Sequence, residues 1–290
     1  MRAAIAVFAS LLFAAQAARA QPAPPPAAPP SPQGPGLPAS GPNQPVPSPS
    51  NAAPEPRAMP VAPPVAAPPP PPGPPPPALA PGLARITGKV TIAGLAPRLA
   101  PIPVSSDMKI CGTSKEDEAL AIGPGGGIRD VVLWIEGGPA LERKPGEKVP
   151  RVKLDQHACQ FVPHVVVAPV GAVLEIINSD SVLHNVHARV GETTVFNYAM
   201  PIKGYVIPRK LGKVELLKVS CDVHSWMHAL VDVLPTTAFA LSDSYGSYFI
   251  DVPPGKYTLK LTHERLGERA EQVEVVAGQT LEHDVSLTPR

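Results

Sequence analysis

The chain of 290 residues contains 43 prolines and 3 cysteines, and its basic and acidic residues balance to a formal net charge of +1 at pH 7. This balance excludes a strongly basic or acidic surface, so we expect no nucleic-acid partner. If two of the three cysteines pair, one thiol is left for chemistry.

Residues 1–20 have the three parts of an export signal. Arg2 supplies positive charge, residues 3–15 are apolar, and Ala18 and Ala20 form the small-x-small pattern of a cleavage site. The apolar stretch is shorter than the roughly 20 residues that span a bilayer, so an uncleaved anchor is the weaker alternative. We predict a periplasmic or secreted protein with no membrane insertion after signal cleavage.

Residues 21–82 hold 28 of the 43 prolines and almost no large apolar side chains. Proline fixes φ and removes a backbone donor, so this segment favours extended polyproline II over helix or sheet. It also lacks the apolar surface that would offset the entropy of ordering. The sequence predicts a disordered Pro-rich segment, either a solvated tail or a tether or docking segment for a partner.

The rest of the chain is predicted to be all-β. Short runs rich in β-branched residues are separated by Gly, Pro, Asn and Asp, which is typical of a sandwich or barrel. Strands are expected at 86–92, 131–135, 165–167, 172–177, 214–220 and 230–234. Further strands at 247–252, 256–261, 273–276 and 281–287 indicate a second, thinner sandwich. We therefore expect one domain at 83–234 and a small β-sandwich at 235–290.

Two segments carry side chains that bind metal ions. His184 follows an expected buried strand, while Cys221 and His224 stand three residues apart between two expected strands, with Met227 three residues further on. Thiolate and imidazole select copper or zinc over magnesium or calcium. If the segments are neighbours, the imidazoles and the thiolate form a trigonal N₂S plane, and the thioether approaches as a weak axial ligand. This is the pattern of electron-transfer copper sites.

These segments resemble the ligand motifs of cupredoxins, especially amicyanin and plastocyanin. The resemblance lies in Asn-x-Asp-x-x-x-His-Asn-x-His at residues 178–187 and in Cys-x-x-His-x-x-Met at residues 221–227. The wider chain resembles bacterial exported proteins, some of them methylamine-utilisation proteins, in which such a domain precedes a carboxypeptidase-regulatory-like sandwich. The resemblance implies a cupredoxin-like Greek-key β-sandwich with one mononuclear copper ion, held by His184, Cys221, His224 and Met227.

Two neighbouring residues, His228 and Asn185, enter the same hypothesis. His228 could replace Met227 and complete a tetrahedral zinc site with the other ligands. Adjacent residues at the start of a strand point to opposite faces, so only one of this pair faces the metal, and the resemblance favours Met227. Asn185 is expected to join the two ligand loops by hydrogen bonds and to hold the site in shape.

Cys111 and Cys159 are the expected disulfide pair, because export places the chain in an oxidising compartment. The alternative is a second metal site made of Cys159, His157 and His164. His157 and Cys159 would share one face of an extended segment, which is the geometry that such a site needs.

We expect a protein that passes single electrons to a redox partner protein and has no catalytic activity, because no nucleophile–base–acid set is visible. His224 should be the ligand nearest the surface, with Leu183 and Trp226 in an apolar docking patch around it. A copper carrier is the alternative, since the same ligands would serve it. A third hypothesis is a non-redox module with a zinc or structural site, whose C-terminal sandwich binds carbohydrate or a partner.

Overall fold

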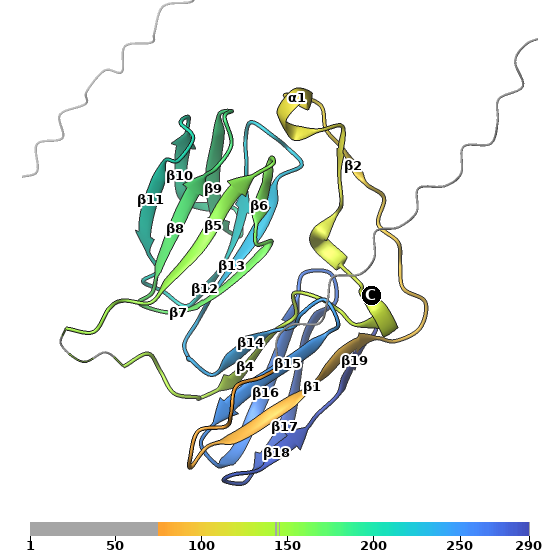
Figure 1. Ribbon diagram of the computed structural model, residues 1–290, viewed down its shortest axis with the longest axis vertical. Coiled ribbons are helices and arrows are strands. Elements are labelled where there is room, and N and C mark those ends of the chain that lie inside the picture. The colour runs from red at the N-terminus through yellow and green to blue at the C-terminus, as the bar shows by residue number, and fades with distance from the viewer. Residues whose placement is uncertain (1–74, 143, 145, 290) are drawn as a thin grey trace, which may run out of the picture. The chain divides into compact units, whose positions relative to one another are not determined.

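The computed structural model describes residues 75–142, 144 and 146–289, and these are mostly strands, as the all-β prediction requires (Figure 1). The expected export signal at 1–20 and the Pro-rich segment up to residue 74 lie outside the described residues. In the part that the structure describes, no helix has the length and apolar surface needed to cross a bilayer. The strands form two sandwiches, each with its own apolar core.

The first sandwich, residues 151–234, has a five-stranded and a four-stranded sheet. In order, the larger sheet contains β10 (Thr193–Met200), β9 (His184–Val190), β12 (Glu215–Ser220), β13 (His228–Leu234) and β7 (Val165–Pro169). The smaller contains β11 (Val206–Lys210), β8 (Val173–Asn178), β5 (Arg151–His157) and β6 (Gln160–Val162), and Figure 1 shows β11, β8 and β5 side by side. In β8, Leu174 and Ile176 are fully buried while Glu175 between them is partly exposed, because successive side chains alternate between faces.

The second sandwich combines strands from distant parts of the chain. One sheet contains β15 (Ser247–Val252), β1 (Ala84–Ile92) and β18 (Thr280–Glu282), with β19 (Val285–Leu287) also paired to β1. The other contains β14 (Phe239–Leu241), β4 (Val132–Glu136), β16 (Gly255–His263) and β17 (Gly267–Val275). Buried pairs such as Ile86 with Ile250 and Leu133 with Leu261 contribute to its core.

This pairing differs from the expected division at residue 234. The sequence places β1 and β4 in the first domain, but their hydrogen bonds join them to strands of the 235–290 segment. β1 supplies the strand that links β15 to β18 and β19, and without it these C-terminal strands would not form one sheet. Alternation along a segment indicates which face is buried, but it does not identify the partner strand.

The segment between β1 and β4 is attached to the first sandwich by a disulfide. It contains the short strands β2 (Ile102–Pro103) and β3 (Ser114–Lys115), helix α1 (Met108–Cys111) and the 3₁₀ turns η1 (Glu118–Leu120) and η2 (Pro124–Gly126). Cys111 ends α1 and is bonded to Cys159 in the turn between β5 and β6, which is the predicted pair. Cys159 therefore has no thiolate to offer, and the alternative metal site with His157 and His164 is wrong.

The disulfide closes a long loop and should stabilise the protein by restricting the unfolded chain. For the sequence separation of 48 residues, the chain-entropy relation gives about 4 kcal/mol. We expect the double variant Cys111→Ser/Cys159→Ser to lower the free energy of unfolding by up to that amount, measured by urea denaturation with circular dichroism. An unchanged midpoint would show that the bond adds no stability.

Asp232 on β13 predicts a pH dependence of stability. Burial, together with the charge of Glu268, raises the pKa of Asp232 to about 6. Because this folded-state pKa lies above the unfolded one, ionisation costs native stability, and that stability is lost as the pH rises from about 4 to 6. We expect Asp232→Asn to remove this loss, at most about 3 kcal/mol. Thermal unfolding of both proteins between about pH 4 and 7 measures it, and parallel curves would contradict the shift.

Candidate metal centre

The pairing of β9 with β12 brings two distant segments together. The strands are antiparallel, and Ser220 at the end of β12 is paired with His187 near the start of β9. His184 is the first residue of β9, and Cys221 directly follows β12. Both predicted ligands therefore lie at the same end of the five-stranded sheet.

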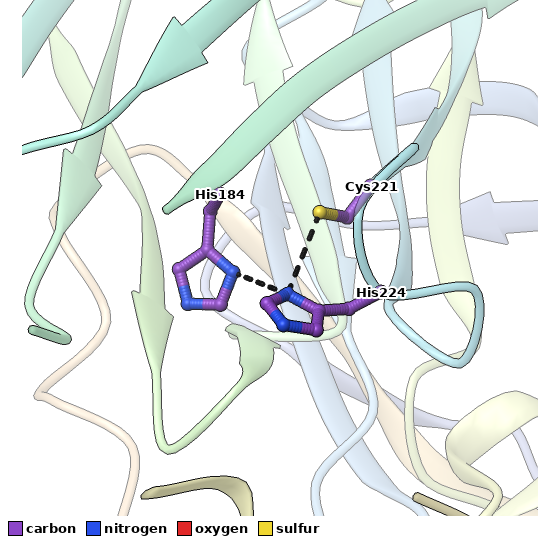
Figure 2. Close-up of side chains that lie close together, drawn as sticks. All are labelled: His184, Cys221 and His224. Atoms are coloured by element: carbon purple, nitrogen blue, oxygen red, sulfur yellow. Dashed lines mark hydrogen bonds between the residues drawn. The ribbon is translucent and has the colours of Figure 1, made fainter. Parts of the chain in front are cut away.

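The loop from β12 to β13 carries His224 and directs it toward the other two side chains (Figure 2). Backbone hydrogen bonds from Met227 N to His224 O (3.0 Å) and from Cys221 N to Met227 O (3.2 Å) close the loop. The Nδ1 atoms of His184 and His224 are 2.9 Å apart, and Cys221 Sγ lies 3.9 Å from His224 Nδ1. Both imidazoles are completely buried, and the free thiol is 3% exposed. The structure thus gathers three of the predicted ligands in one buried group.

Each imidazole is held on its other side by a carboxylate. His184 Nε2 lies 3.0 Å from Asp180 Oδ2, and His224 Nε2 lies 2.9 Å from Asp107 Oδ2. An ionised carboxylate only accepts hydrogen bonds, so each Nε2 carries a proton, and in a neutral ring Nδ1 then presents a lone pair. Two such nitrogens 2.9 Å apart need a shared proton or a metal cation between them. Since carboxylate–imidazole pairs also orient metal ligands, this donor set fits a metal ion.

The surroundings of His184 favour its neutral form. Burial lowers the pKa of His184 below its ordinary value and the neighbouring His224 adds to this effect, although Asp180 opposes it. Burial acts against ionisation of Asp180 as well, but hydrogen bonds from the Cys159 and Ala158 amides and from His184 hold the pKa of this carboxyl below its usual range. A neutral imidazole beside an ionised carboxylate is ready to bind a cation without first losing a proton.

Asp180 also holds the turn between β5 and β6. Ala158 and Cys159 form this two-residue turn with φ of 49° and 56°, in the left-handed region that residues other than glycine adopt at a cost. The Asp180 carboxylate accepts their backbone N–H groups at 2.8 and 2.7 Å, and Trp226 donates its indole N–H to Cys159 O at 3.0 Å. One carboxylate thus fixes both a ligand ring and the turn that carries the disulfide. Sequence reasoning noted Asp180 only as part of a motif.

The expectation that His224 is the ligand nearest the surface is wrong. The His224 ring is completely buried, and its Nε2 contacts Asp107, which precedes α1 in the disulfide-linked segment. Trp226 is only 5% exposed, so it belongs to the core and not to a docking patch, whereas Leu183 and Val223 are exposed. Sequence spacing carries no signal for Asp107, because 117 positions separate it from His224.

Asn185 connects the two ligand segments. Its Oδ1 accepts the backbone N–H of Asp222 at 2.5 Å, and its Nδ2 donates to Asn197 Oδ1 and Asp222 Oδ2, both at 2.8 Å. His187 Nδ1 lies 3.0 Å from the same carboxylate, and Asn197 donates to it at 3.0 Å. Since Asp222 directly follows Cys221, these bonds hold the backbone next to Cys221 against β9.

Met227 and His228 have different neighbours. Met227 is 1% exposed and packs in the core of the first sandwich, within the loop that carries His224. The His228 ring lies against His164, with ring centroids 5.1 Å apart. Among the described residues, His228 groups with His164 and not with the three buried ligands. The axial role of Met227 stays a prediction from the motif.

No protein-family model matches the chain, and no curated protein matches it. Among solved structures it is similar to a copper-containing nitrite reductase from Thermus scotoductus SA-01, at 20% identity over 33% of this chain and 25% of that chain (TM-score 0.27). It is similar to a purple cupredoxin from Nitrosopumilus maritimus at 22% identity over 29% and 99% of the two chains (TM-score 0.25). A reduced amicyanin variant is 19% identical over 35% and 98% (TM-score 0.27). The chain spans only a quarter of the nitrite reductase, and similarity at this level assigns no function.

The contact between Asp107 and His224 should affect metal affinity. Asp107→Ala removes the acceptor that keeps the proton on His224 Nε2, and loss of such an outer partner weakens metal binding by roughly 10- to 100-fold. Competition of wild type and variant with a chelator for Cu(II) measures the change. Glu116→Ala, at an exposed acid of the same segment, is the control and should bind as wild type does. Equal affinities of all three proteins would mean that Asp107 has no part in the site.

Proposed function

We propose that His184, Cys221 and His224 bind one mononuclear copper ion, with Met227 as weak axial ligand, and that the protein transfers single electrons. The observation that carries this proposal is the pair of Nδ1 atoms at 2.9 Å beside a buried free thiol, with both Nε2 atoms engaged by carboxylates. A His₂Cys set with a weak axial Met is the donor set of electron-transfer copper sites. A bound copper ion supplies the Cu(II)/Cu(I) couple.

The rigidity of the surroundings favours electron transfer over copper delivery. Both imidazoles are completely buried, so water is kept from the ligands. Their orientations are set by Asp180 and Asp107, and the segment that carries Asp107 is tied to the sandwich by the disulfide. A site held in one arrangement needs little rearrangement when its charge changes by one. A carrier needs the opposite property, because its ligands have to open to release the ion.

We place the contact with a redox partner at the exposed apolar side chains beside the ligands. Leu183 precedes His184 and is 48% exposed, and Val223 precedes His224 and is 44% exposed. Together they offer a short route from the surface to both imidazoles, although the His224 ring itself is covered. We propose no catalytic activity for this chain, only exchange of electrons with that partner.

We also propose that the protein works outside the cytoplasm. The bond between Cys111 and Cys159 is of the kind that persists in oxidising compartments. The sequence of residues 1–20 has the parts of an export signal, which agrees with such a location.

The visible spectrum tests the copper site. Protein loaded with one equivalent of Cu(II) should show an intense thiolate-to-copper charge-transfer band, and Cys221→Ser should abolish it because the thiolate is the electron donor of that band. His283→Gln, which changes an imidazole of the second sandwich, should keep the band. Absence of the band in wild type would show that the copper proposal is wrong.

The reduction potential tests the axial ligand. Met227→Leu should keep the band and shift the potential, because the axial sulfur tunes the couple. An unchanged potential in Met227→Leu, with an altered spectrum in His228→Gln, would assign the axial role to His228. Rapid transfer of copper from wild type to a weak chelator would favour the carrier over the electron-transfer protein.

A further inference from the structure

A second group of ligand-type side chains surrounds His228. His164, His228 and Glu264 place their donor atoms within 4.8 Å of one another. His164 directly precedes β7, His228 begins β13, and Glu264 lies in the turn between β16 and β17. The two histidines are brought together by the parallel pairing of β13 with β7, which includes a 2.9 Å hydrogen bond from Leu230 N to His164 O.

His164 is the buried member of this group. It is only 4% exposed, its Nε2 lies 2.8 Å from Glu264 Oε2, and its buried Nδ1 has no hydrogen-bond partner among the described residues. A buried polar nitrogen without a partner is destabilising and needs an explanation, and a bound ion is one such explanation. The carboxylates of Glu264, Glu118 and Asp130 lie near enough to this ring to interact with it electrostatically.

His228 and Glu264 make the group accessible. The His228 ring stands nearly perpendicular to that of His164, at an interplanar angle of 89°. Its Nδ1 lies 3.2 Å from the carbonyl oxygen of Trp226, so Nδ1 is the donor and Nε2 keeps its lone pair. His228 and Glu264 line a cleft of about 750 Å³. Its lining also includes acids such as Asp232 and Glu268 and the basic residues Arg189, Lys218 and Arg265. An ion can reach the lone pair from this cleft.

We propose that His164, His228 and Glu264 form a second metal site, which binds a divalent transition-metal ion such as Zn²⁺. Two imidazoles and one carboxylate are the N₂O donor set of open sites for borderline divalent ions, and the cleft provides room for water at the remaining positions. The site differs from the buried trio in having no sulfur donor and in its access to solvent. It shares no ligand with the buried trio, so it can be tested separately from the copper proposal.

The assignment also accounts for the opposite environments of Met227 and His228. Adjacent residues entering a strand point to opposite faces. Met227 packs in the core of the first sandwich, and His228 meets His164 and Glu264. One peptide unit thus separates a residue of the proposed copper site from a ligand of the proposed second site.

Zinc stoichiometry in the full chain tests this proposal. Zn²⁺ is redox-inert, so it leaves the Cys221 thiol unoxidised. The variant Cys221→Ser removes the sulfur ligand of the buried trio and should still bind one Zn²⁺ in isothermal titration and in metal analysis after gel filtration. Adding Glu264→Gln should weaken this binding by more than about 100-fold, since loss of a direct ligand exceeds the loss of an outer partner. Adding Glu268→Gln, which removes a neighbouring acid of the same cleft, should leave it unchanged.

Each alternative outcome decides the matter. If Glu264→Gln lowers the melting temperature without affecting Zn²⁺ binding, the contact between His164 and Glu264 is only structural and the proposal is wrong. If Glu268→Gln weakens binding as much as Glu264→Gln, the cleft attracts cations by its overall charge and holds no built site. His228→Gln provides a second ligand deletion, with circular dichroism to verify folding, and unchanged binding there would also overturn the proposal.

Discussion

The hydrogen bonds between the two buried imidazoles and their carboxylates constrain the rest of the first sandwich. With Nε2 of His184 bonded to Asp180 and Nε2 of His224 bonded to Asp107, both Nδ1 lone pairs are directed to one place, 2.9 Å apart. Neither ring can turn away without leaving a buried nitrogen unpaired, which costs more than the hydrogen bond itself contributes. The two carboxylates therefore fix the direction of both rings.

The two carboxylates are supplied by different parts of the fold. Asp180 comes from the loop after β8 and at the same time accepts two amides of the β5–β6 turn, so the ligand ring and the disulfide turn depend on each other. Asp107 comes from the segment between β1 and β4, both of which belong to the second sandwich. The segment between two strands of the second sandwich thus contributes to the candidate metal centre, because it provides the carboxylate that contacts His224.

The start of β13 is where the two clusters of ligand-type residues come closest along the chain. Strand alternation sends Met227 and His228 to opposite sides, one into the apolar core and one toward β7 and the β16–β17 turn. Asp232, four residues further along β13, lies in the same cleft as His228 and has a raised pKa because it is buried near another acid. Carboxylates and imidazoles therefore meet in one cleft outside the proposed copper site.

The sequence by itself determined the strand character of most segments and the chemistry of the buried trio. The alternation of side chains along 173–178 predicts that Leu174 and Ile176 share the buried face. The three-residue spacing of Cys221 and His224 places them in one turn. Alternation and spacing are both properties of a short stretch of sequence. Tertiary structure alone decided that β1 and β4 pair with the C-terminal strands, that Asp107 covers His224, and that His228 meets His164 and Glu264. These contacts join positions up to 195 residues apart, as for Lys89 with Asp284. No local pattern encodes them, because they depend on which strands pair and how the resulting sheets pack.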